Sequence, residues 1–133
     1  MREIRLIFLV LMLIFGTQTI TFAQADVIKN VRTAMKTGSS KELVKYMNNT
    51  VELTFDGEKS SYSRTQAEFI LRDFFKKNPP KDFQYIHQGA SKQKGLKYVI
   101  GKYTCDSGSY RVYMLFKQFK GVYMVDLIDF SKE

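Results

Sequence analysis

Residues 96–130 read LKYVIGKYTCDSGSYRVYMLFKQFKGVYMVDLIDF, and this stretch decides the fold. It holds three runs rich in Tyr, Val, Ile and Phe, separated by Asp-Ser-Gly-Ser at 106–109 and by Lys-Gly at 120–121. Aromatic and β-branched residues favour strands, and Gly beside small polar residues or Lys favours turns. The stretch therefore predicts a three-stranded antiparallel meander.

The chain before the meander alternates between helical and strand-like patterns. Apolar residues at helical spacing predict a helix over 26–37, a short helix that Ser39 and Glu42 cap, and a helix from Ser63 that Asn78-Pro79-Pro80 ends. Period-two alternation and an Asp-Gly turn predict a hairpin over 51–62, and a fourth long strand is expected over 82–91. This order predicts an α+β domain in which a highly twisted sheet wraps around the helices as a cone with an open end.

The amino terminus has the pattern of a signal peptide. Arg2 and Arg5 precede ten apolar residues at 6–15, a run too short to span a bilayer but suited to an exported leader. Small residues allow cleavage before Gln24, which we favour, or before Asp26; an uncleaved anchor is the alternative. We therefore expect a signal peptide at 1–23, one domain at 24–133, a periplasmic or extracellular location, and no stable membrane insertion after cleavage.

Composition excludes several classes of site. The sequence shows no metal-ligand cluster, phosphate loop or nucleophile elbow, so we assign no cofactor, no metal and no catalytic residue. Cys105 is the single cysteine, which rules out an intramolecular disulfide and indicates a buried structural role. The net charge of +8 is spread over scattered lysines, and export argues against nucleic acid as a partner.

Three short motifs resemble a known family. They are His87-Gln88-Gly89-Ala90-Ser91, KYVIG at 97–101 and YRVY at 110–113, and they look like a family of secreted bacterial proteins known only as a domain of unknown function. The order of elements resembles the nuclear-transport-factor-2-like fold, also called cystatin-like and shared with ketosteroid isomerase. The resemblance covers the whole mature chain and implies the fold and export, but no activity.

The expected strand pairing brings a small polar group together. A four-residue loop at 106–109 pairs Tyr103 with Val112 and places the more apolar residues on the concave face. Continued alternation beyond the Lys-Gly turn puts Asp129 on that face near Tyr103 and Tyr110, an arrangement suited to a small polar site. Asp129 also lies near the chain end, where exposure to water is the competing interpretation. The candidate pocket residues are Tyr103, Tyr110, Asp129, His87 and Met114.

Two further predictions concern the outer face of the sheet. His87 pairs with Tyr98 on the outer face if residues 91–94 form a four-residue loop, whereas a three-residue loop turns it to the concave side beside Val99. Arg111 shares the outer face with Tyr98 and Tyr113, so these three residues are a candidate interaction face or an ordinary amphipathic surface.

Three classes of function follow from these features. We favour a non-catalytic module that binds an unknown small molecule in the cone or a protein on the sheet. The alternative, by fold analogy, is a ketosteroid-isomerase-like or dehydratase-like enzyme with Asp129 or His87 as base. A third class is a homodimer assembled through the sheet. The enzyme requires an enclosed apolar pocket that one of these bases reaches, and a cone plugged by Phe and Met side chains would exclude it.

Overall fold

The computed structural model describes residues 23–133, with side chains from Val27 onward. The predicted apolar leader segment at 6–15 lies outside the described residues. The helices are α2 (Ala23–Thr37), α3 (Ser40–Val44) and α4 (Arg64–Lys77). The strands are β1 (Met47–Phe55), β2 (Glu58–Ser63), β3 (Pro80–Ala90), β4 (Leu96–Cys105), β5 (Gly108–Phe119) and β6 (Val122–Lys132). The fold is α+β, as predicted.

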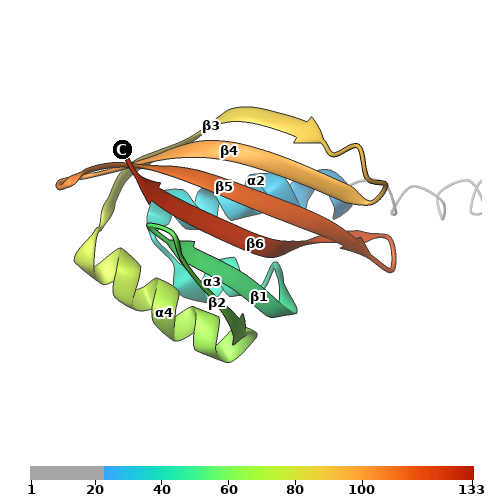
Figure 1. Ribbon diagram of the computed structural model, residues 1–133, viewed down its shortest axis with the longest axis horizontal. Coiled ribbons are helices and arrows are strands. Elements are labelled where there is room, and N and C mark those ends of the chain that lie inside the picture. Colours follow the sequence, from blue (N-terminus) through green and yellow to red (C-terminus); the bar gives the residue numbers. More distant parts are fainter. Residues whose placement is uncertain (1–22) are drawn as a thin grey trace, which may run out of the picture.

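The strands form one curved, unclosed sheet in the order β2-β1-β6-β5-β4-β3 (Figure 1). Neighbouring strands are antiparallel except β1 and β6, which run parallel and bring the hairpin β1–β2 against the last strand. β1 begins at Met47, earlier than the predicted start at Val51, because Met47 already pairs with Val125 of β6. The parallel pair therefore joins the two halves of the domain.

Helix ends are set by short-range hydrogen bonds that the sequence predicts. The Ser39 hydroxyl accepts a hydrogen bond from the Glu42 amide at the start of α3. At the start of α4, Ser63 and Gln66 form both halves of a capping box. Each cap satisfies backbone donors that the first turn of a helix leaves without a partner.

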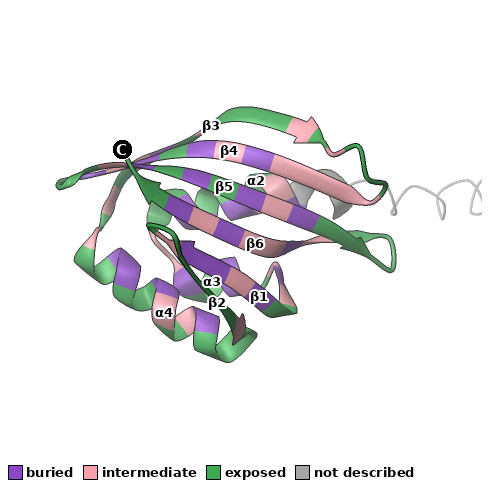
Figure 2. Cartoon of the chain, viewed as in Figure 1, coloured by how far each residue is buried: buried purple, intermediate pink, exposed green. Residues whose placement is uncertain are grey.

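All three helices pack on one face of the sheet, and we call this the inner face. The buried side chains alternate along β4, β5 and β6 with half-buried or exposed ones (Figure 2). Large side chains from both layers fill the interior, namely Met35, Leu43, Leu71, Phe74, Phe75, Phe83, Tyr103, Met114, Phe116, Ile128 and Phe130. The cone is thus a packed hydrophobic core in the described part of the chain.

The turn between β4 and β5 is shorter than predicted. Cys105 pairs with Gly108 and Tyr103 with Tyr110, so the predicted pairing of Tyr103 with Val112 is wrong by two residues. A shift of two leaves every side chain on its predicted face, because the side-chain period of a strand is two. Val112, Met114 and Cys105 accordingly lie buried on the inner face, as expected.

A β-bulge changes the faces of β6. Phe116 pairs with Val125, but the next residue, Leu115, pairs with Leu127, so Asp126 is an extra residue with no partner in this ladder. Ile128 and Phe130 therefore point into the core, where both are fully buried. Leu127 and Asp129 lie on the outer face, and their predicted inner placement is wrong. The bulge allows Val125, Ile128 and Phe130 to share one face, which strict alternation could not do.

Candidate functional site

The structure buries three of the predicted pocket residues in the core. Tyr103, Tyr110 and Met114 lie on the inner face, with less than a tenth of each residue exposed, and the two tyrosines pack against α4. The Phe74 ring fills the space between them, with its centroid 5.5 Å from that of Tyr103 and 5.3 Å from that of Tyr110. Phe130 closes the cluster at 4.6 Å from Phe74. Aromatic rings thus occupy the position expected for a pocket.

The buried phenols act as structural hydrogen-bond donors. The Tyr103 hydroxyl donates to the backbone carbonyl of Asn78, and the Tyr85 hydroxyl donates to that of Ile28 at 2.6 Å. Burial raises the pKa of both phenols above its ordinary value. Burial also raises the pKa of Tyr110, with a smaller contribution from the Asp56 carboxylate. These groups stay neutral and anchor β3 and β4 to the neighbouring helices.

The two candidate bases lie on the outer face. Asp129 pairs with Tyr113 on one side and with Thr54 on the other, and its Oδ1 accepts a hydrogen bond of 3.3 Å from the Ser131 hydroxyl. The predicted placement of Asp129 on the inner face is therefore wrong, because Phe130 and not Asp129 pairs with Val112. Because the sheet separates Asp129 from Tyr103 and Tyr110, the predicted polar group does not assemble. The geometry gives no support to the enzyme alternative.

His87 faces outward, as the longer of the two predicted loops requires. It pairs with Ile100, two residues beyond the predicted partner Tyr98, because the ladder closes at Ala90 and Lys97. Its Nε2 nevertheless lies 3.0 Å from the Tyr98 hydroxyl, and the two ring centroids are 5.5 Å apart. His87 thus belongs with the interaction face, and not with the pocket.

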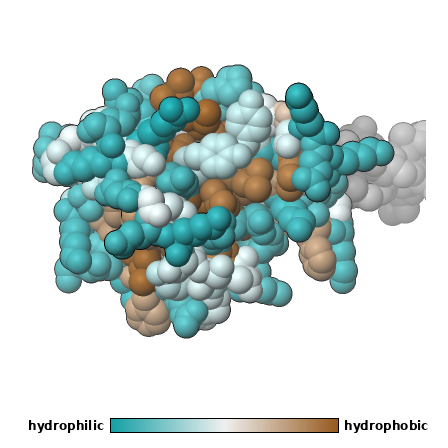
Figure 3. Space-filling model, in the orientation of Figure 1, coloured by the Kyte–Doolittle hydropathy of each residue, from teal (hydrophilic) through white to brown (hydrophobic). Residues whose placement is uncertain are grey.

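The three residues of the candidate interaction face, Tyr98, Arg111 and Tyr113, share the outer face of the sheet. The Tyr98 and Tyr113 rings stack with centroids 6.2 Å apart, and Arg111 lies in β5 opposite Lys102 and Ser131. We define the aromatic patch as the half-buried and exposed outer-face residues His87, Tyr98, Ile100, Tyr113, Leu115 and Leu127. Figure 3 shows apolar and aromatic side chains gathered over β4, β5 and β6, with hydrophilic residues around them.

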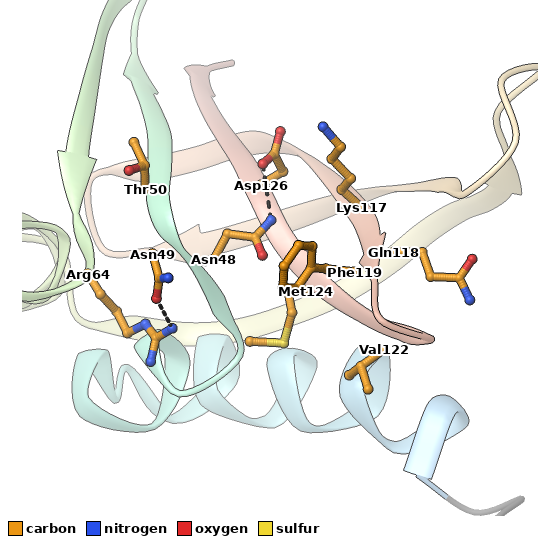
Figure 4. A pocket seen from close by; sticks show the side chains of 10 residues that line it. All are labelled: Asn48, Asn49, Thr50, Arg64, Lys117, Gln118, Phe119, Val122, Met124 and Asp126. Atoms are coloured by element: carbon orange, nitrogen blue, oxygen red, sulfur yellow. Dashed lines mark hydrogen bonds between the residues drawn. The ribbon is translucent and has the colours of Figure 1, made fainter.

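A second surface feature escaped the sequence analysis. A groove of about 580 Å³ lies between the start of β1 and the β5–β6 hairpin (Figure 4). It exists because β1 runs from Met47 to Glu52 while its partner advances only from Val125 to Leu127, so the two strands separate. Detecting it would require knowledge of the parallel pair, for which the sequence carries no local signal.

The groove combines an apolar wall with polar groups, four of which are paired with one another. Asn48 donates a hydrogen bond of 3.1 Å to Asp126, and Arg64 donates one of 2.8 Å to Asn49. The apolar wall consists of Phe119, Val122 and Met124.

Among the described residues no group of three or more His, Cys, Asp or Glu side chains could hold a metal ion. No helix in residues 23–133 is long and apolar enough to cross a membrane.

Known structures share this fold at high and low sequence identity. A protein of the DUF4783 family from Bacteroides ovatus is 35% identical, with 78% of this chain and 93% of that chain covered and a TM-score of 0.74. Its counterpart from Bacteroides uniformis is 28% identical, with coverage of 79% and 95% and a TM-score of 0.74. An NTF2-like protein of unknown function from Shewanella baltica is 9% identical, with coverage of 82% and 90% and a TM-score of 0.63.

The sequence comparisons agree with the structural ones. None of the curated proteins matched the chain. The family described as "Domain of unknown function (DUF4783)" matches residues 28–131, which span most of the chain and nearly all of the described domain. The resemblance stated from the three motifs and from the order of elements is thereby confirmed. The chain belongs to the DUF4783 family, and its domain has the nuclear-transport-factor-2-like fold.

Proposed function

We propose that the protein is an exported, non-catalytic interaction module that associates with a second copy of itself through the aromatic patch. The observation that carries this proposal is the contrast between the two faces of the sheet. The inner face is filled by Phe74, Phe130 and their neighbours, so core side chains occupy the interior of the cone in the described domain. The outer face instead presents stacked rings to solvent.

The composition of the patch suits a protein partner. Tyr and Arg are enriched at protein interfaces, because they offer large contact areas together with hydrogen-bonding groups. Tyr113 remains 36% exposed, although it lies at the centre of the sheet. Water covers this surface in the monomer, so a partner that displaces the water gains apolar burial.

The charges around the patch favour a copy of the same chain. Lys102 and Arg111 lie on β4 and β5, whereas Asp129 lies on the neighbouring strand β6. A two-fold axis parallel to the strands would place the basic side of one copy against the acidic side of the other. Such self-complementarity is what a symmetric dimer interface requires.

Light scattering after size exclusion, applied to a protein that begins at Gln24, tests the association. We expect a dimer, and we expect that changing both Tyr98 and Tyr113 to Ala weakens dimerisation about 30-fold or more, because buried aromatic residues are typical hot spots. The matched control is Phe69→Ala, which removes a ring that is 61% exposed on α4, away from the patch, and it should leave the dimer unchanged. A wild-type monomer at the highest attainable concentration would overturn the proposal.

Export is tested separately. Expression of the full chain, followed by cell fractionation and sequencing of the amino terminus, should give a protein that begins at Gln24 outside the cytoplasm. The expectation rests on the charged and apolar pattern of residues 1–23. A protein that keeps Met1 in the cytoplasmic fraction would contradict it.

A further inference from the structure

At one end of the sheet, two neighbouring segments carry lysines and no carboxylate. Residues 91–97 contain Lys92, Lys94 and Lys97, and residues 117–122 contain Lys117 and Lys120, with no Asp or Glu in either segment. Asp126, which lines the same groove as Lys117, accepts a hydrogen bond from Asn48. The two segments lie side by side: Leu96 pairs with Lys117, and the Gln118 amide donates a hydrogen bond of 2.8 Å to the Gly95 carbonyl. We call these two segments the hairpin end. Five positive charges are therefore concentrated in adjacent loops and strand ends.

These charges are not compensated within the domain. None of the five lysines forms an ion pair with a carboxylate in the described part of the chain. Elsewhere, Lys45, Lys59, Lys77 and Lys81 each pair with an Asp or Glu at 3.2 Å or less. At the hairpin end two of the ammonium groups lie over rings instead, one of them that of Lys97, 4.4 Å from the centre of the Tyr123 ring. The end is thus a local excess of positive charge, available to an external anion.

The same end exposes apolar side chains. Phe119 is 64% exposed and Val122 is 43% exposed, on the two sides of the β5–β6 turn. Lys120 lies between them in sequence, with its ammonium 5.6 Å from the centre of the Phe119 ring. Both apolar side chains line the same groove as Lys117 (Figure 4). A projecting apolar pair flanked by lysines has the composition of a segment that lies at a membrane–water interface.

The start of the domain lies at this end too. α2 begins beside the β3–β4 and β5–β6 turns (Figure 1), so the residues before Ala23 join the domain here. The exposed Lys29 in α2 adds a further basic side chain.

We propose that the hairpin end binds the surface of a membrane that contains anionic lipids. The lysines contact the lipid phosphates, while Phe119 and Val122 enter the interfacial layer. A soluble polyanion would satisfy the lysines but would leave the projecting apolar pair in water. The combination of charge and apolar side chains therefore favours a bilayer surface.

Vesicle flotation tests this proposal with the chain from Gln24 onward. The crystallised relatives are covered over 93% and 95% of their length by this domain, which shows that the domain folds without a leader segment. Vesicles are made of phosphatidylcholine alone or of an equal mixture of phosphatidylcholine and phosphatidylglycerol. We expect binding to the mixed vesicles only, and weaker binding as salt is added.

Two sets of variants locate the binding surface. The pair Lys94→Glu and Lys120→Glu should weaken vesicle binding about 25-fold or more, since each basic residue near an anionic surface contributes about fivefold. The matched control is the pair Lys41→Glu and Lys76→Glu on α3 and α4, which changes the net charge equally. These lysines are exposed and form no ion pair in the described residues. The control pair should therefore bind vesicles more tightly than the hairpin-end pair, because only the overall net charge of the protein has changed. Phe119→Ala should weaken binding about fivefold at constant charge.

Three results would overturn the proposal. Equal binding to both kinds of vesicle would remove the role of lipid charge. An equal loss of vesicle binding in the control pair would show that the overall charge of the protein, and not the hairpin end, determines binding. Unchanged vesicle binding of Phe119→Ala, together with equally tight binding of wild-type protein to heparin, would identify a general polyanion surface. Circular dichroism of each variant verifies that the fold is retained.

Discussion

Nε2 of His87 lies 3.0 Å from the phenol oxygen of Tyr98, and the same phenol covers the backbone of Gly89. A Cβ atom at position 89 would lie 2.7 Å from that oxygen and 2.8 Å from the ring carbon that bears it. Gly89 thus permits the contact between His87 and Tyr98 on the outer face. The motif around His87, which carried part of the family resemblance, has a packing role at this glycine.

Gly89→Ala should displace the Tyr98 ring and destabilise the protein. We expect the free energy of unfolding to fall by about 1–2 kcal/mol, the usual effect of overpacking. Urea unfolding measures this change. In a protein that already carries Tyr98→Ala, the Gly89→Ala change should have little effect, because the clashing ring is gone. An equal loss in both backgrounds would show that Tyr98 is not the cause.

Gly101 gives a second prediction of this kind, inside the core. A Cβ atom there would lie 2.6 Å from the Phe83 ring and 3.1 Å from the Gln84 carbonyl oxygen. Because Phe83 is fully buried, its ring has little freedom to move, and Gly101→Ala should destabilise the protein by about 2–3 kcal/mol. Thermal and urea unfolding of Gly101→Ala, Phe83→Leu and the double variant form a double-mutant cycle. Strict additivity would contradict the clash.

Because of the bulge at Asp126, truncation to Ala should affect stability very differently at the adjacent positions 128 and 129. Ile128→Ala should lower the free energy of unfolding by about 3 kcal/mol, because it removes fully buried methyl and methylene groups. Asp129→Ala, on the outer face, should change it by no more than about 0.5 kcal/mol. Chemical denaturation of both variants decides between the observed register and strict alternation. A larger loss of stability for Asp129→Ala than for Ile128→Ala would support the inner-face placement of Asp129 that the sequence predicted.

Alkaline pH should destabilise the protein through its buried phenols. Burial raises the pKa of Tyr85 and Tyr103 in the folded state, whereas the unfolded phenols ionise near their ordinary value of about 10. Above that pH the unfolded state binds fewer protons than the folded one, so the free energy of unfolding decreases as the pH rises. The contribution is fully present below about pH 10.

Tyr85→Phe should lower the stability at neutral pH but should reduce the loss of stability in alkali. At neutral pH the variant loses the hydrogen bond to the Ile28 carbonyl, and we expect about 1 kcal/mol of destabilisation. Above about pH 10 its stability should fall less steeply than that of the wild type, because one buried phenol is absent. Urea unfolding over this pH range measures both changes. An unchanged slope would show that Tyr85 does not contribute to alkaline unfolding.

The sequence predicted what depends on nearby residues. The caps at Ser39 and Ser63 each involve a partner three residues away, and both form. The placement of Tyr98 and Tyr113 on one face followed from alternation within one antiparallel pair, where even an error of two residues keeps the faces. The outer-face placement of Tyr98, Arg111 and Tyr113 was therefore predictable, whereas that of Leu127, beyond the bulge, was not.

Features that depend on distant strands were not predictable. The extra residue Asp126 is favoured by the whole core, since it allows Ile128 and Phe130 to pack together against α4 and the neighbouring strands, and nothing within β6 announces it. The groove beside Asn48 depends on the parallel pairing of β1 with β6, whose partners Met47 and Val125 lie far apart in the chain. Asp129 was predicted on the wrong face because the bulge at Asp126 shifts the alternation of β6 by one residue.

Asp126 also matters for how relatives of this chain are compared. A relative that lacks a residue at this point would need its large apolar side chains two and four residues after the counterpart of Val125, where they occupy the places of Ile128 and Phe130 in the core. An alignment that opens the gap elsewhere in β6 would then place core residues in columns of surface residues. The correct column for an insertion or deletion in this strand is therefore Asp126, next to Val125, and family comparisons of the last strand should be anchored there.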